Sequence, residues 1–142
     1  MYKSILLAVD LVHDKSWSKA LPTAVEYAQK FGSTLHLVTV VPSYGMSIVG
    51  TFFPPDFEQK AEAAAAKQLS TFAKEHVPGG VKVETHVALG RSYEEILEAA
   101  KKLSVDLIVI GSHQPGTEDF FLGSTASSVV RFARCSVLVV RG

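Results

Sequence analysis

The chain has 142 residues, 47% of them hydrophobic and 20% charged, with fourteen basic residues balancing fourteen acidic ones. This length predicts one domain, residues 1–142, that buries about two thirds of the surface exposed in the unfolded chain. A net charge of zero removes the attraction that most nucleic-acid-binding proteins use, so we expect no nucleic-acid partner. The apolar run near the N-terminus is too short for a signal peptide or a membrane span, so we expect no membrane association.

Cysteine usage indicates the redox compartment. The single cysteine, Cys135, cannot form an intrachain disulfide, which favours a reducing, cytoplasmic location. Because free cysteines are usually buried, we expect a buried thiol that packs in the core.

Apolar runs alternate with helical periodicities along the chain. The runs that predict strands are residues 4–9, 34–41, 81–88, 105–110 and 136–140. The predicted helices lie around residues 17–28, 56–76, 92–103 and 124–133. Pro22 is expected in the first turn of its helix, where a missing N–H does no harm. Ser92 and Glu95 have the spacing of a capping box at the start of the third helix.

Strands that alternate with helices predict a parallel sheet with right-handed crossovers and helices on both faces. The runs at 4–9, 34–41 and 105–110 are apolar almost throughout, as expected for central strands. Residues 81–88 alternate apolar with polar side chains, which predicts an edge strand. We therefore expect a single doubly wound, Rossmann-like α/β domain with a five-stranded parallel sheet of order 3-2-1-4-5.

In that strand order, ligands bind beyond the carboxyl ends of the first and fourth strands. Asp10 and Gly111 stand at those two ends, and residues 123–126, Gly-Ser-Thr-Ala, begin the last helix. The free N–H groups and the dipole of a helix start favour an anion such as phosphate, which glycine lets approach closely. Simpler interpretations stay open, in which Ser124 only caps the helix and Asp10 only caps a turn.

Beyond these features, the chain resembles a known family. The segment VDLIVIGSHQPGTEDFFLGSTASSVVRFARCSVLVVRG resembles the C-terminal signature of the universal stress protein family. That signature consists of Gly-x-x-Gly, then nine residues, then Gly followed by Ser or Thr. ILLAVD, LVTVVPS and LGRSYEEILEAA fit as well, so the likeness covers nearly the whole chain. The small F/G-type branch has Ser-His-Arg-Pro where this chain has Ser112-His113-Gln114-Pro115. Gln114 replaces that arginine (the family signature has Gly there), and the loop to Gly123 is one residue shorter than the family pattern.

The resemblance implies a site for ATP (or AMP or ADP), with a divalent cation such as Mg2+ held mainly by the phosphates. It implies Ala8 and Val40 at the adenine, Asp10 at the ribose or adenine, Ile110, Gly111, Ser112 and His113 at the ribose and α-phosphate, and Gly123, Ser124, Thr125 and Ala126 at the phosphates. It also implies a homodimer through residues 136–140, an edge strand whose free backbone groups invite pairing.

The function that we predict is that of a dimeric, ATP-binding stress-response regulator with an unidentified protein partner. No catalytic residue is assigned, because the phosphate site has no evident base or arginine finger. One alternative is a slow ATPase, or an autophosphorylating or adenylyl-transferring enzyme, in which Glu118, Asp119 or His113 would act. Another is a nucleotide-free dimeric scaffold that binds its partner through the apolar loop 41–56.

Two further expectations concern loop 41–56 and the remaining histidines. Because a loop this apolar should not lie bare in water, we expect a lid over the adenine or a contact with a second subunit. The other histidines lack the spacing of metal ligands in the sequence, so we predict no metal site built from protein side chains. They are His13, His36, His76 and His86.

Overall fold

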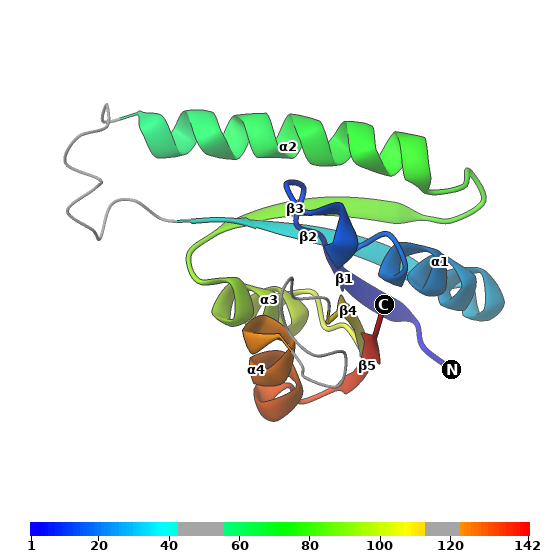
Figure 1. Cartoon of the computed structure of the whole chain (residues 1–142). Coiled ribbons are helices and arrows are strands. Elements are labelled where there is room, and N and C mark those ends of the chain that lie inside the picture. Colours follow the sequence, from blue (N-terminus) through cyan, green and yellow to red (C-terminus); the bar gives the residue numbers. More distant parts are fainter. Residues whose placement is uncertain (43–55, 113–122) are drawn as a thin grey trace.

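Five parallel strands form one sheet in the order β3-β2-β1-β4-β5 (Figure 1). The computed structural model describes residues 1–42, 56–112 and 123–142. The strands are β1 (Ser4–Ala8), β2 (Thr34–Val41), β3 (Val83–Leu89), β4 (Leu107–Gly111) and β5 (Ser136–Val140). The predicted strand order and parallel pairing are therefore confirmed, with β3 and β5 at the two edges.

Helices cover both faces of this sheet (Figure 1). They are α1 (Ala20–Phe31), α2 (Phe57–His76), α3 (Ser92–Lys102) and α4 (Ser124–Phe132), with a short 3-10 helix, η1 (Asp14–Ser16), after β1. One core lies between the sheet and α1 with α2, and the other lies between the sheet and α3 with α4. Among the helices that the structure describes, none is long and apolar enough to cross a bilayer.

The position of β1 in the middle of the sheet explains why the strand is apolar after Ser4. Successive side chains of a strand point to opposite faces. Ile5 and Leu7 therefore enter the core beneath α1 and α2, while Leu6 enters the core beneath α3 and α4, and all three are fully buried. Each such side chain contributes about 1.5–3 kcal/mol to folding through burial.

Several local predictions can be compared with the structure. Pro22 lies in the first turn of α1 as expected, although that helix begins at Ala20 and not at Trp17. The capping box at Ser92 is wrong: Arg91 is the N-cap, and no side chain caps this helix. Because Ser92 is already the first helical residue, Glu95 falls one position too late for the reciprocal bond, and its own N–H bonds the Arg91 carbonyl.

Cys135 is half-buried, which corrects the expectation of a fully buried thiol. It packs against the core on the α3 and α4 side of the sheet. Burial raises the pKa of the Cys135 thiol above its usual value, so the reactive thiolate is disfavoured at neutral pH.

Candidate functional site

A pocket of about 590 Å³ lies beyond the carboxyl ends of β1 and β4. It is lined by Ala8, Val9, Asp10, Val12, His13, Ser16, Val38, Val40, Pro42, Ser92, Ile96, Ile110, Gly111, Ser112, Gly123, Ser124, Thr125 and Ala126. This volume is within the usual range for small-molecule sites, about 300–1,000 Å³. Every described residue that we expected to contact the nucleotide lines the pocket, whereas His113, Gln114, Glu118 and Asp119 lie outside the described residues.

The first turn of α4 forms one wall of the pocket. Gly123 is the N-cap with an extended backbone (φ −62°, ψ 158°), and no side chain among the described residues caps the helix. Ser124 therefore stands one position too late to be the cap, which removes the simpler interpretation of this serine. The first N–H groups of a helix have no intrahelical acceptor, so those at 124–126 are available to an anion in the pocket.

Asp10 holds the turn that follows β1. Its Oδ1 accepts a hydrogen bond of 3.0 Å from the Val12 N–H, and its Oδ2 accepts one of 2.9 Å from Nδ1 of His13. The interpretation of Asp10 as a turn cap is therefore correct. The side chain is nevertheless 52% exposed, and a carboxylate offers about four lone-pair sites. Asp10 can cap this turn and still accept hydrogen bonds from a ligand.

Ser16 and Gly111 connect the β1 turn to the end of β4. The Asp10 N–H donates to Oγ of Ser16 over 3.1 Å, which fixes η1 against the start of the turn. A Cβ atom at Gly111 would lie only 2.5 Å from the Ser16 carbonyl oxygen. We expected glycine here to admit a ligand, but the space that its missing side chain leaves is filled by the backbone of Ser16.

Ser112 connects the pocket to the edge strand β5. Its side chain lines the pocket and is almost fully buried. Its N–H donates to the carbonyl of Val140, the last residue of β5, over 3.0 Å. This backbone hydrogen bond joins the wall of the pocket to the outermost strand, in addition to the pairing of Ile110 and Gly111 with β5.

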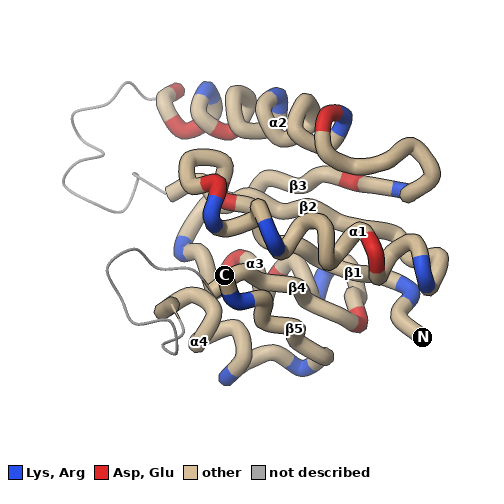
Figure 2. The backbone as a smooth tube through the Cα atoms, turned by 45° about the vertical axis from the view of Figure 1, so that its right-hand side comes forward, with Lys and Arg blue, Asp and Glu red and all other residues tan. Residues whose placement is uncertain are grey.

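The pocket has an apolar part and a polar part. Val38, Ile96 and Ile110 are buried and belong to the core beneath α3 and α4, so the apolar lining continues that core. Among the described lining residues there is no Lys or Arg. Arg131 is in the last turn of α4, and Figure 2 shows Lys and Arg spread over several elements of the chain. The start of α4 therefore supplies the positive potential through its peptide groups.

Several residues that line the pocket were not predicted from the sequence. His13 and Ser16 follow Asp10 at three and six residues, in a turn whose hydrogen bonds have no recognisable sequence pattern. Val38, Ser92 and Ile96 reach the pocket because α3 packs over β2 on the same face of the sheet. The alternation of β2 gives a signal for Val38 once Val40 is placed, because residues two apart share a face.

This fold and site have relatives. The sequence profile of the universal stress protein family matches residues 1–141. The chain is 35% identical to Universal stress protein G of Escherichia coli O157:H7, over 99% of this chain and all of that one. The solved universal stress protein UspA from Lactobacillus plantarum is 28% identical, with a TM-score of 0.75 over 99% of this chain and 98% of that one.

A second solved relative is more distant. The universal stress protein from Archaeoglobus fulgidus in complex with dAMP is 24% identical, with a TM-score of 0.65 over 97% of each chain. At this identity the likeness concerns the fold. Family profile, curated relative and solved structures all span nearly the full chain. The chain belongs to the universal stress protein family.

Proposed function

We propose that this protein binds an adenine nucleotide, ATP first, in the pocket between β1, β4 and α4, and acts in the cytoplasm as a dimeric regulator. The observation that carries the proposal is the first turn of α4, which no described side chain caps and which opens into a pocket with an apolar wall. Such a turn binds phosphate groups, and an apolar pocket of this size holds a base.

Each part of the nucleotide has a complementary group. The peptide N–H groups of residues 124–126 would donate to phosphate oxygens, and the hydroxyls of Ser124 and Thr125 would add further hydrogen bonds. The Asp10 carboxylate would accept hydrogen bonds from ribose hydroxyls or from the adenine amine. Val40 and its neighbours on the apolar wall would contact the base. The Archaeoglobus fulgidus relative was solved with dAMP, which supports adenine as the base to test first.

A divalent cation such as Mg2+ would neutralise part of the phosphate charge when the nucleotide binds. The described lining residues offer one carboxylate, Asp10, and both of its oxygens already accept protein hydrogen bonds. This donor set fits a cation that is held mainly by the phosphates.

A regulator is favoured over a fast enzyme by what the pocket offers to a reacting phosphate. Among the described lining residues, the two ionisable side chains are Asp10 and His13, and these two are paired with each other. Fast phosphoryl transfer needs a positioned base or water and cationic stabilisation of the transferred group. We therefore expect ATP turnover far below one per second, and a rate near that value would favour the enzyme alternative.

The dimer would form through β5. Within the described part of the sheet, β5 pairs with β4 alone, so its other edge offers free peptide groups. Val130 and Phe132 of the neighbouring helix α4 are 46% and 55% exposed and would extend the contact with apolar surface. Pairing of β5 with the same strand of a second copy would continue the sheet across the two subunits.

A proline at position 124 tests the nucleotide site with little effect on folding. Proline is well tolerated at the first position of a helix, and Gly123 before it already has an extended backbone that suits proline. Ser124→Pro removes one peptide donor and the hydroxyl, whereas Ser124→Ala removes only the hydroxyl. A hydrogen bond to a charged group contributes about 1.5 kcal/mol, so the proline variant should bind ATP roughly tenfold more weakly.

The measurements are isothermal titration with ATP and the melting temperature with and without nucleotide. The alanine variant is the matched control and should bind ATP more tightly than the proline variant, because it keeps the peptide donor. Equal ATP affinity in the wild type and the proline variant, at equal melting temperatures without ligand, would refute the phosphate site. Adenine nucleotide released on denaturing the purified protein would exclude the nucleotide-free scaffold.

A further inference from the structure

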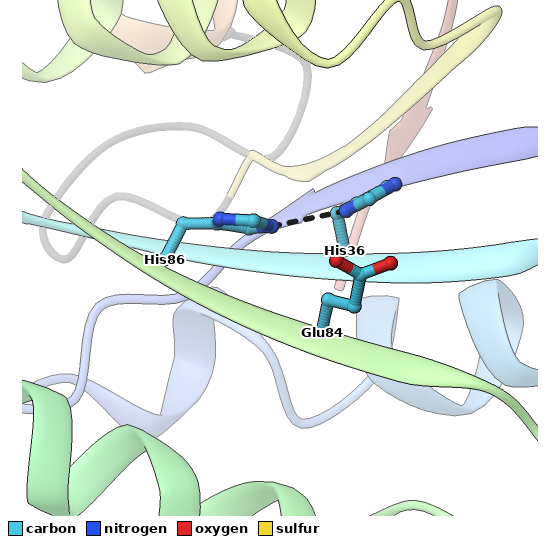
Figure 3. A group of neighbouring side chains, drawn as sticks. All are labelled: His36, Glu84 and His86. Carbon is cyan, nitrogen blue, oxygen red and sulfur yellow. Dashed lines mark hydrogen bonds between the residues drawn. The ribbon is translucent and has the colours of Figure 1, made fainter.

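Three side chains that could bind a metal meet on the surface of the paired strands β2 and β3. The parallel register places His36 opposite Glu84 and Val38 opposite His86. Residues two apart on a strand share a face, so His36, Glu84 and His86 all project from the same side of the sheet. Figure 3 shows the two imidazoles facing each other, with the Glu84 carboxylate beside them.

The distances among these groups suit one ion. Nδ1 of His36 and Nε2 of His86 are 3.0 Å apart and share a hydrogen bond. One nitrogen from each imidazole and one Glu84 oxygen all lie within 4.8 Å of one another. Two nitrogens that bind one tetrahedral zinc ion at about 2.0–2.1 Å are about 3.3 Å apart. The imidazoles would therefore separate by only a few tenths of an ångström to admit the ion.

The hydrogen bond between the two imidazoles requires one of the two facing nitrogens to carry no proton, and an unprotonated ring nitrogen is the atom that a metal binds. Burial, reinforced by the neighbouring His86, lowers the pKa of His36 below its usual value. The negative charge of Glu84 raises the pKa of His36, and the positive charge of Lys82 lowers it.

The burial of the three residues gives the site a fixed inner side and an open outer side. His36 is only 6% exposed, His86 is half-buried and Glu84 is exposed on the edge strand. Leu6, which is paired with His36 on β1, is fully buried, so the inner side of the cluster adjoins the core. None of the three candidate ligands lines the nucleotide pocket, so this cluster is a separate feature.

We propose that His36, Glu84 and His86 bind a divalent transition metal, zinc in particular, with water completing the tetrahedral shell. Two imidazoles and a carboxylate are a donor set that zinc accepts. Our expectation of no metal site rested on sequence spacing, but His36 and His86 are brought together by the register of two strands. An ion held there would tie the edge strand β3 to β2 and raise the melting temperature of the protein.

The test uses the full, untagged chain after removal of metal with a chelator and of nucleotide by washing. Titration with Co2+ alone should give the intense visible absorption of a tetrahedral complex, which saturates at one equivalent. One equivalent of Zn2+ should then displace the cobalt and raise the melting temperature. Glu84→Gln and His86→Gln should each weaken the affinity for both metals about tenfold or more.

Matched controls come from the same residue types elsewhere on the chain. His76→Gln removes an imidazole whose Nδ1 bonds the Phe72 carbonyl, and Glu98→Gln removes an exposed carboxylate of α3. Both should bind cobalt as the wild type does. Ser124→Pro should also keep the metal, so failure of the nucleotide site and failure of the metal site are distinguishable.

Two results would overturn the proposal. One is the absence of a saturable tetrahedral cobalt spectrum in the wild type. The other is unchanged affinity in Glu84→Gln and His86→Gln, which would place any bound metal elsewhere. Because Glu84 is exposed and His86 half-buried, these variants should fold, and the test does not depend on replacing the buried His36.

Discussion

The contact between Gly111 and Ser16 gives a prediction that the structure makes quantitative. In Gly111→Ala, the new methyl group would lie 2.5 Å from the Ser16 carbonyl oxygen. An unstrained contact of this kind needs about 3.5 Å, so the two backbone segments must separate by roughly 1 Å. Since Gly111 is paired with Val140 in the sheet, we expect the Ser16 segment to move.

The cost of this movement has two parts. Overpacking of a well-packed contact destabilises a protein by about 1–3 kcal/mol, which for a chain of this size lowers the melting temperature by roughly 3–12 °C. The displaced segment also carries the Oγ that accepts the Asp10 N–H. The substitution should therefore weaken ATP binding in addition to stability, although residue 111 presents no side chain to the ligand.

The assay is thermal unfolding followed by ATP titration at a temperature where every variant is folded. Gly80→Ala is the matched control, because a Cβ at Gly80 meets no atom within 4 Å and its φ is not in the left-handed range. That control should melt at or slightly above the wild-type temperature. If Gly111→Ala matches Gly80→Ala in both measurements, the reasoning about this contact is wrong.

Three further predictions concern the dimer, pH and the core. The Val140 carbonyl points toward β4, so the peptide groups of Val139 point away from the sheet. Val139→Pro removes the outward N–H and should give monomers in sedimentation at micromolar concentration. The control Val139→Ala should stay dimeric. Burial and His86 lower the pKa of His36 in the folded protein below 6.5. The unfolded chain therefore binds this proton more tightly, so the free energy of unfolding should decrease as pH falls below about 6.5. His36→Gln should reduce that decrease, measured by urea unfolding with a chelator present; an unchanged pH dependence would contradict the assignment. Phe72→Ala removes a buried ring whose centroid lies 4.7 Å from that of Trp17, and it should lower the free energy of unfolding by about 3–5 kcal/mol. The measurement is urea unfolding followed by Trp17 fluorescence. A loss of stability below about 1 kcal/mol would show that this contact does not stabilise the core.

The sequence predicts the sheet well because burial leaves a strong periodic signal. Residues 4–9 and 105–110 must face helices on both sides, so almost every position is apolar, whereas β3 carries polar residues because it lies at an edge of the sheet, where none of its residues is fully buried. These patterns determine which strands are central. Asp10 and Gly111 could be assigned to the site because the strand order places both at the same edge of the sheet.

The ends of the helices were harder to predict, for a physical reason. Ser92 and Ser124 are both of a residue type that is preferred at the N-cap, yet each is the first helical residue. The N-caps are Arg91 and Gly123. The difference is one residue of extended backbone, and it depends on the turn that precedes the helix. At Ser124 this shift matters for the proposed nucleotide site, because the first peptide donors of α4 then have no cap among the described side chains.

Contacts between elements distant in the chain could not be predicted from local spacing. His36 and His86 meet only because β3 begins at Val83 and pairs in one particular register with β2. A slip of one residue would move His86 to the opposite face of the sheet. The Ser16 contact with Gly111 likewise depends on the path of η1, for which the sequence gives no periodic signal.

If the protein binds a nucleotide and dimerises through β5 as we propose, the hydrogen bond from Ser112 to Val140 would couple these two events. If the ligand shifts Ser112, it shifts the end of β5, and a second copy paired with β5 shifts Ser112 in turn. Such coupling is reciprocal: whatever factor dimerisation adds to ATP affinity, ATP adds to dimerisation. The cellular concentration of the protein would then set its sensitivity to nucleotide, so that an increase in its abundance lowers the ATP level at which it responds.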